Sequence, residues 1–427
     1  MIAIAMLVAL FALVLINVPI AVALGVIATV AMVAKAGPDN LLGAAVVLFE
    51  GATSFPLIAI PLFVLAGAIM NTSGISRRLI AFASALLGFI RGGLSMVNIG
   101  TSMFFAEISG SAVADVAAIG SILIPAMKRR GYPTNFAAAV TSSSASLAII
   151  IPPSIPMILY ATIADTSVVQ MFVAGIVPGL IGAGGLMAVS YWFAVRYDYP
   201  VEEVFQLRRL WATFKDAAWA FLLPIIILGG IFGGLVTATE GAGLAVVAAL
   251  FIGLFVYREL NLGHLYRALV DGAVQTAVVM LLVATSALLG LYLTESRIPQ
   301  AVAQGIVQLT ENRYLVLAML NVLFLVLGLF LHGAAAIILV VPIVMPIVHL
   351  VGIDPVHFGL IVTLNLAIGQ QTPPVASVLI TACSIAKADV WEVTKVNVPF
   401  ICVLAAVLLL VTYVPIVPLA LVELFYR

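Results

Sequence analysis

The sequence has 427 residues, of which 64% are hydrophobic and 8% are charged, and its formal net charge is zero at pH 7. Soluble domains carry about 25% charged residues, so this composition excludes a single soluble domain and predicts an all-α protein that crosses a membrane many times. The balanced charge, without any basic run, also argues against nucleic-acid binding.

Apolar segments of membrane-spanning length follow one another along the whole chain. The first, residues 2–16, has no basic residues before it and is followed at once by a second apolar segment, so we expect a span and not a signal peptide. Amphipathic pieces between the spans are expected at the membrane surface. The other apolar segments are 19–34, 55–71, 93–109, 112–127, 134–164, 168–195, 218–236, 239–258, 274–294, 314–331, 333–350, 354–386 and 390–423, and the amphipathic pieces are 40–50, 74–91, 197–217, 259–272 and 296–313.

Two pairs of apolar segments are predicted to form re-entrant hairpins. Residues 93–128 turn at the Ser-Gly-Ser sequence of 109–111, and residues 314–350 turn at the His-Gly pair of 332–333. Two apolar helices joined by so short a turn enter and leave the membrane on the same side. Non-helical tips of this kind are tolerated where they are buried in protein or line a cavity.

Two further segments, 134–164 and 354–386, are each interrupted by adjacent prolines, Pro152–Pro153 and Pro373–Pro374. Proline removes a helical hydrogen bond and clashes with the preceding turn. The freed carbonyl groups cannot face lipid, so each break is expected to be buried or to line a cavity. A matched pair of broken helices in two halves of a chain indicates the binding site of a secondary transporter.

The proline pairs are 221 residues apart, and other prolines and glycines recur at the same offset. This recurrence predicts two homologous halves. We place the first repeat at 1–200, a cytoplasmic amphipathic linker at 201–217 and the second repeat at 218–427.

The two halves are predicted to have opposite orientations in the membrane. With the N-terminus outside and each hairpin returning to its own side, 14 basic residues are cytoplasmic and four are outside. The first hairpin then opens from the cytoplasm and the second from the opposite face, and both termini are periplasmic. Inverted repeats of this kind are typical of alternating-access carriers.

The first hairpin tip is a candidate cation site. Hydroxyl groups and free carbonyls at helix ends supply the oxygen ligands that a hard cation such as sodium prefers. The small residues of the tip also allow it to approach the facing break closely. The alternative is that the two serines merely cap a tight turn. The candidate ligands are Ser109, Gly110, Ser111, Ile151 and Pro152.

A second cation site is predicted where the other hairpin tip faces its break. Gly369 leaves room for the backbone, Thr372 offers a hydroxyl and Gln370 an amide. Histidine is a side chain that could titrate, so His332 raises proton coupling as an option, or it acts as a hairpin cap. The full set of candidate ligands is His332, Gly333, Gly369, Gln370, Thr372 and Pro373.

The substrate is expected between the two cation sites. The half-helices that start after the proline pairs direct their positive ends inward, which suits a carboxylate. No Arg or Lys is expected at this depth, so anion binding would depend on dipoles, hydroxyls, amides and bound cations. Each candidate could instead be a polar packing residue between helices. The candidates are Ser143, Ser144, Ser146, Asn365 and Gln371.

Six stretches carry a resemblance to a known family: IPLFVLAGAIMNTSGISRR (60–78), SGSAVAD (109–115), IPPSIP (151–156), TATEGAG (237–243), GIDPVHFG (352–359) and TPP (372–374). From end to end the chain resembles the large membrane subunit of a tripartite ATP-independent periplasmic (TRAP) transporter. The resemblance implies an elevator-type carrier with sodium as the coupling ion and no other cofactor. It also implies two partners, a small four-helix membrane subunit and a periplasmic binding protein, and substrates that are mostly small carboxylates or sialic acid.

The resemblance also carries the sodium sites over by position, to 109–111 with 151–153 and to the second tip with 369–373. Two places depart from the family pattern: His332 stands at an aspartate position, and Gln370 and Gln371 replace an apolar pair. The composition of the second site therefore stays open. No small-subunit helices are fused at the N-terminus, so we expect that subunit as a separate chain.

The function that we expect is sodium-driven import of a small organic anion across the bacterial inner membrane. One alternative is a stand-alone sodium- or proton-coupled anion symporter that needs no binding protein. Another is a passive channel or membrane scaffold, because a hydrophobic bundle alone shows no coupling. An enzyme is not expected, because the loops contain no nucleophile–base pair, phosphate loop or metal-ligand cluster.

Overall fold

The computed structural model describes residues 6, 8–10, 12–13, 16, 18–37, 41–202, 204–310 and 312–426. In this part of the chain the regular structure is helical without any strand, and eight helices are long and apolar enough to cross a membrane. The expected all-α polytopic membrane fold is confirmed. Most of the first expected span, 2–16, lies outside the described residues.

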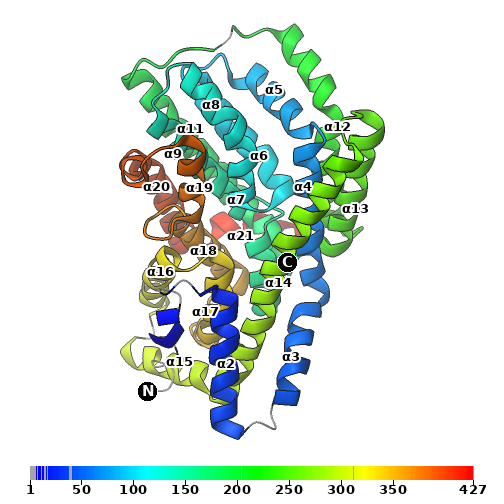
Figure 1. Cartoon of the computed structure of the whole chain (residues 1–427). Helices are drawn as coiled ribbons and strands as arrows, with labels where there is room; N and C mark the ends of the chain where they lie inside the picture. Colours follow the sequence, from blue (N-terminus) through cyan, green and yellow to red (C-terminus); the bar gives the residue numbers. More distant parts are fainter. Residues whose placement is uncertain are drawn as a thin grey trace.

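Both halves of the chain run through outer helices, a hairpin, a broken helix and a long helix, in that order (Figure 1). The first half contains α2 (Ile20–Ala36), α3 (Leu41–Thr53), η2 (Phe55–Ile58), α4 (Ala59–Thr72), α5 (Ile75–Leu87), α6 (Gly93–Ser109), α7 (Ala112–Asp115), η3 (Val116–Gly120), α8 (Ser121–Arg129), α9 (Thr134–Ala145), η4 (Ser146–Ile149), α10 (Ile155–Ile163) and α11 (Val168–Arg196). The second contains α12 (Leu207–Phe232), α13 (Ala238–Phe251), η5 (Ile252–Val256), α14 (Leu262–Glu295), α15 (Ile298–Leu309), α16 (Arg313–Phe330), α17 (Gly333–Leu350), α18 (Pro355–Gly369), α19 (Ser377–Ala386), α20 (Val390–Tyr413) and α21 (Ile416–Tyr426).

The predicted hairpins and breaks correspond to defined groups of helices. The first hairpin consists of α6 and the run α7–η3–α8, in which η3 is a π-helical turn, and the second consists of α16 and α17. The first broken helix is α9–η4 and α10, and the second is α18 and α19. Both proline pairs are joined by cis peptide bonds. The starts of α7 and α17 lie 221 residues apart, as do the starts of α9 and α18.

Three predicted element boundaries are wrong. The apolar segment 390–423 was expected as one span, but it divides into α20, which ends at Tyr413, and α21, which starts at Ile416. The amphipathic piece 197–217 and the span 218–236 were expected as separate elements, but α12 runs continuously from Leu207 to Phe232. The pieces 259–272 and 274–294 likewise form the single 34-residue helix α14. Charged residues such as Arg, Lys and Glu are good helix formers. A transition from polar to apolar residues along the sequence therefore does not by itself end a helix.

The two halves interlock at the broken helices. α9 packs against α19 and α20, and α10 packs against α17 and α18. Tyr160 Oη donates a hydrogen bond to the carbonyl oxygen of Pro355 at 2.7 Å, which joins α10 to the start of α18. The long helix α14 packs along α2, α3 and α4 and forms with them one side of the molecule (Figure 1). The first break is therefore buried among packed helices, as its freed backbone groups require, whereas residues 372–375 of the second break are partly or fully exposed.

Candidate functional site

The first hairpin tip is a tight turn at Gly110, which adopts a left-handed conformation with φ of 59°. Ser111 follows in an extended conformation, and its Oγ accepts a hydrogen bond from the backbone N–H of Ala114 at 3.5 Å. Ser111 therefore caps α7, as the simpler interpretation of the serines expects. The side chain of Ser109 lies outside the described residues.

Backbone atoms of the first break lie directly against this tip. The N–H of Ile155 donates to the carbonyl oxygen of Gly110 at 3.3 Å. A Cβ atom added to Gly110 would come within 2.9 Å of the Pro153 carbonyl oxygen. The contacts of the tip are thus with Pro153 and Ile155, and the predicted ligands Ile151 and Pro152 precede them in a buried stretch of the break.

The second hairpin tip meets its break through backbone and side-chain atoms. The N–H of Val375 donates to the carbonyl oxygen of Leu329 at 3.1 Å. A Cβ atom on Gly333 would lie 2.6 Å from Nε2 of Gln370, so the Gln370 amide covers the start of α17. His332 is exposed and gives α17 no side-chain cap, so the interpretation of His332 as a hairpin cap is wrong.

The remaining residues predicted for the second cation site have different environments. A Cβ atom on Gly369 would come within 2.6 Å of Gly328 backbone atoms, so α18 and α16 touch backbone to backbone here. Thr372 Oγ1, in the break, donates to the carbonyl oxygen of Ile368 near the end of α18 at 2.9 Å. Thr372 and Pro373 are partly exposed, whereas residues 151–160 of the first half are all buried.

A polar cluster joins the two breaks in the core. Ser143 Oγ, from α9, lies 2.7 Å from Oε1 of Gln371 and 2.6 Å from Oδ1 of Asn397, which belongs to α20. Nδ2 of Asn397 donates to the same Oε1 of Gln371 at 3.0 Å. All three side chains are buried. The structure therefore brings together Ser143 and Gln371, which belong to different halves of the chain.

Ser144 and Asn365, which are 221 residues apart, each bind an asparagine on the first hairpin helix of their own half. Ser144 Oγ donates to Oδ1 of Asn98 on α6 at 3.0 Å. Asn365 Nδ2 donates to Oδ1 of Asn321 on α16 at 2.7 Å. Ser146, in contrast, donates to a backbone carbonyl of its own helix. Four of the five predicted substrate residues thus join the polar core, and Ser146 does not.

Three asparagines of this core were missed at the sequence level: Asn98, Asn321 and Asn397. Each carries an amide inside an apolar segment, which by itself marks a residue that needs a partner in a membrane. That signal could have identified all three.

Several buried polar atoms beside the breaks have no hydrogen-bond partner among the described residues. They include Nε2 of Gln371, Oδ1 of Asn365 and Oγ of Ser142. The residues that carry them have no exposed surface. Because more than nine in ten buried polar groups are hydrogen-bonded, each of these atoms still has the capacity to form a hydrogen bond with a water molecule, an ion or a solute.

A small cavity of about 150 Å³ separates the first hairpin tip from α4 and α14. Its polar lining includes Asn71, Ser111, Asp271 and Gln275. A much larger cavity of about 1530 Å³ lies between α2, α14 and α15, but its lining is mostly aliphatic. The described residues contain no group of three or more His, Cys, Asp or Glu side chains placed to hold a metal ion. A cation at the tips would therefore depend on carbonyl, hydroxyl and amide oxygens.

A family model described as "Tripartite ATP-independent periplasmic transporter, DctM component" matches residues 7–417. A relative from Oleidesulfovibrio alaskensis, "Isethionate TRAP transporter permease protein DctMQ", is 43% identical over 405 residues; the match covers 95% of this chain but 64% of that protein's length. "C4-dicarboxylate TRAP transporter large permease protein DctM" of Pseudomonas aeruginosa is 40% identical over 90% of each chain. "Sialic acid TRAP transporter permease protein SiaT" of Haemophilus influenzae is 38% identical, over 85% of this chain and 59% of that one.

A solved structure shares the fold. The crystal structure of the Alcanivorax borkumensis YdaH transporter, described as having an unusual topology, aligns with a TM-score of 0.63 and 17% sequence identity. The alignment covers 88% of each chain.

Proposed function

This chain belongs to the DctM component family of tripartite ATP-independent periplasmic transporters, and we propose that it imports a small organic anion by using a sodium gradient. As a member of that family it is a transport permease of the bacterial membrane and not an enzyme. The solute, the coupling ion and the partners are our proposals.

The observation that carries the proposal is the buried contact between the breaks. Ser143 of one half and Gln371 of the other share a hydrogen bond, and Nε2 of Gln371 has no partner among the described residues. A buried amide N–H without a partner is a donor for an anion. The helix starts at Ile155 and Ser377 add N–H groups and a positive dipole end.

Sodium is the coupling ion that the two tips suit best. Gly110 and Leu329 present carbonyl oxygens to their breaks, and unwound backbone of this kind coordinates sodium in broken-helix transporters. Ser111 and Gln370 add a hydroxyl and an amide beside these carbonyls. Neutral oxygen ligands favour a hard, singly charged ion over a transition metal.

The substrate class follows from the relatives and from the donors in the core. Relatives are named for isethionate, C4-dicarboxylates and sialic acid. All three are small organic anions, and an amide with helix-end N–H groups is a suitable donor set for one. We therefore infer that the solute is a carboxylate, a sialic acid or a sulfonate of this size.

Alternating access is proposed to come from two inverted halves that act as one elevator-type transport unit. The 221-residue offset between α7 and α17 and between α9 and α18 supports a repeat. The basic residues favour opposite orientations, with both termini periplasmic. The hairpins and broken helices interlock as one body that faces α2–α4 and α12–α14. A small membrane subunit and a periplasmic binding protein are the proposed partners, at the bacterial inner membrane.

Uptake into proteoliposomes that contain this chain and its small membrane subunit tests the proposal. Radiolabelled C4-dicarboxylates, isethionate and sialic acid are offered with and without the binding protein and an inward sodium gradient. We expect saturable uptake of one of these solutes that needs both additions. Uptake that persists without sodium contradicts the coupling ion, and uptake without the binding protein supports a stand-alone symporter instead.

A further inference from the structure

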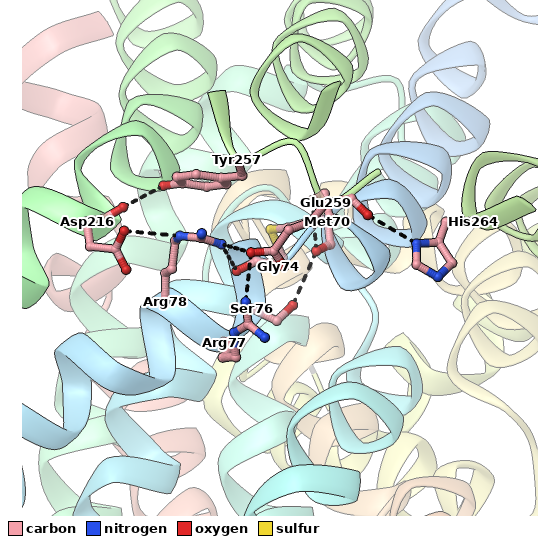
Figure 2. Close-up of polar contacts among 10 residues, drawn as sticks. Met70, Gly74, Ser76, Arg77, Arg78, Asp216, Tyr257, Glu259 and His264 are labelled. Carbon is pink, nitrogen blue, oxygen red and sulfur yellow. Dashed lines mark hydrogen bonds and ion pairs between the residues drawn. The ribbon is translucent and has the colours of Figure 1, made fainter. Parts of the chain in front are cut away.

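The corner between α4 and α5 is fixed by one arginine, Arg78 (Figure 2). Its Nη1 donates to Oε1 of Glu259 at 2.9 Å and to the carbonyl oxygen of Gly74 at 3.0 Å. Its Nε donates to Oδ1 of Asp216 on α12 at 3.3 Å. The guanidinium thus joins α5 to α12 and to the segment between η5 and α14.

An aromatic ring closes the same corner from another side. The guanidinium carbon of Arg78 lies 3.7 Å from the centroid of the Tyr257 ring, within cation–π range. Tyr257 Oη in turn donates to the backbone carbonyl of Asp216 at 2.8 Å. Burial lowers the pKa of Arg78, but the hydrogen bonds and charges of Glu259 and Asp216 outweigh this effect and raise the pKa above its usual value. The arginine is therefore charged at any physiological pH.

The corner is built tightly around Glu259. Gly74 has a φ of 75°, and a Cβ atom added there would lie 2.1 Å from Oε2 of Glu259. The backbone carbonyl of Glu259 lies 3.2 Å from Nδ1 of His264 in the first turn of α14 (Figure 2). Arg77 also contacts Glu259, at 2.7 Å, but its side chain is 71% exposed, against 15% for Arg78. Of the two neighbouring arginines, Arg78 is the one enclosed by the corner.

The helix that Arg78 fixes leads directly into the first hairpin. α5 packs against both α12 and the hairpin helix α6. Phe82 of α5 contacts Phe104 of α6 at 6.1 Å and Phe221 of α12 at 5.0 Å between ring centroids. The corner also borders the cavity of about 150 Å³ beside the first hairpin tip, because Ser76 Oγ donates to Oδ1 of Asn71, which lines that cavity. α5 therefore connects the hairpin helix α6 to α12, beside the direct contacts that α6 makes with α4, α11 and α12.

We propose that Arg78 is a positioning residue of the transport cycle, which holds the start of α5 on the frame of α12 and α14 while the first hairpin moves. This inference rests on the proposed transport function. It assigns Arg78 no contact with the solute. Its loss releases α5 to follow the hairpin, so the carrier completes fewer productive cycles while solute binding is unchanged. Lysine is a partial substitute, because it keeps the charge but cannot bind two carboxylates and stack on the ring together.

The test compares two arginines on one helix that share a carboxylate partner. Arg78→Ala, Arg78→Lys and the matched control Arg77→Ala are reconstituted with the small membrane subunit and the binding protein. Counterflow exchange of the solute that the wild-type chain carries is measured against solute concentration. For Arg78→Ala we expect the maximal rate to fall at least tenfold and the half-saturating concentration to stay within twofold. Arg78→Lys should recover part of the rate, and Arg77→Ala should keep both parameters within twofold.

A double-mutant cycle separates a positioning role from independent losses. If Arg78 acts through Glu259, Arg78→Ala combined with Glu259→Gln should be no slower than Arg78→Ala alone. Equal maximal rates for Arg78→Ala and Arg77→Ala overturn the proposal. A tenfold rise in the half-saturating solute concentration of Arg78→Ala also overturns it. If Arg78→Ala does not accumulate in the membrane, Glu259→Gln alone carries the test, because it removes the charge and keeps the side chain's size.

Failure of this inference can be distinguished from failure of the proposed sodium coupling. Counterflow depends on exchange of labelled solute and not on an ion gradient. A wild-type chain that exchanges solute without sodium contradicts the coupling ion, and the comparison of Arg78 with Arg77 then still decides the positioning role.

Discussion

The two hairpin tips occupy equivalent places in the chain but meet their breaks in different ways. The first contact is made by backbone atoms of Gly110, Pro153 and Ile155, within a fully buried break. The second adds the side chain of Gln370 over Gly333, beside a break that is partly exposed. A backbone contact is independent of side-chain identity apart from the need for glycine, whereas a side-chain contact can vary. Side-chain substitutions can therefore change the contact at the second tip more readily than the contact at the first.

The helices behind the tips show the same difference. In the first half the return helix contains the π-helical turn η3 directly after Asp115, whereas α17 is continuous from Gly333 to Leu350 although it contains two prolines. π turns are frequent at functional sites because they re-aim the side chains around them. The first half therefore depends more on its backbone conformation, and substitutions that disturb the backbone should cost more there.

Substitution at Gly110 should have the largest effect. Gly110→Ala places a Cβ atom 2.9 Å from the Pro153 carbonyl oxygen, in a left-handed conformation with φ of 59°. Such a conformation costs a non-glycine residue about 1–2 kcal/mol, and the opposing atom is backbone that cannot turn away. We expect uptake to fall at least tenfold and the thermal unfolding temperature of the purified chain to drop.

Gly184→Ala in α11 is the matched control, because a Cβ atom there meets nothing within 4 Å. It should leave both uptake and the unfolding temperature near the wild-type values. Wild-type uptake by Gly110→Ala would show that the tip and the break do not stay in contact during transport.

Gln371→Glu tests the proposed solute site between the two breaks and not the hairpin tips. The glutamate keeps an oxygen acceptor for Ser143 and Asn397 but replaces the unpartnered Nε2 donor with a second oxygen. The loss of a hydrogen bond to a charged group costs about 1.5–3 kcal/mol, and the added negative charge opposes an anion. We expect the half-saturating solute concentration to rise more than tenfold in uptake assays.

The same exchange at Gln308, which is exposed on α15, tests whether added charge alone produces the effect. Gln308→Glu should leave the half-saturating concentration unchanged. An unchanged value for Gln371→Glu would remove Gln371 from the solute site and leave it as a packing residue.

The fold could be predicted from the sequence because its strongest determinants are local. Proline pairs at 152–153 and 373–374 interrupt helices wherever they stand in a membrane segment, and the Ser-Gly-Ser and His-Gly turns end helices for equally local reasons. The continuity of α12 and α14 was not predictable from composition. The polarity of a segment indicates whether water or an apolar environment surrounds it. Both helices continue from their polar part into their apolar part without a break in their backbone hydrogen bonds.

The polar core was predictable in part. Ser143, Ser144 and Asn365 were identified because they adjoin the breaks, and Gln371 because two amides in a membrane break need partners. Asn397 was missed, because it lies 26 residues after Gln371 on another helix and only packing brings the two together. Sequence spacing identifies groups on one element, whereas the register of α20 against α9 depends on the whole core.

Gly333→Ala should have a smaller effect than Gly110→Ala. Its Cβ atom would approach Nε2 of Gln370 to 2.6 Å, which is the far end of a flexible side chain and not backbone. Gly333 also has no positive φ angle that would exclude alanine. We expect a two- to fivefold loss of uptake. Combining Gly333→Ala with Gln370→Ala, which removes the opposing amide, should recover uptake if steric contact is the cause. A loss as large as that of Gly110→Ala would show that both tips depend equally on their backbones.

The smallest effect is expected at the corner that leads into the second hairpin. Lys35 lies 3.5 Å from Glu295 at the end of α14, and their side chains are 40% and 50% exposed. Exposed ion pairs contribute about 0–1 kcal/mol, so Lys35→Ala should change the maximal uptake rate by less than twofold and leave the thermal unfolding temperature nearly unchanged. Arg78 lies against two carboxylates and a ring at the corresponding corner of the first half, and its loss is expected to cost more than the loss of Lys35. A tenfold loss of the maximal uptake rate in Lys35→Ala would mean that the corner between α14 and α15 also depends on a single charge. The difference between the two halves would then be confined to the hairpin tips.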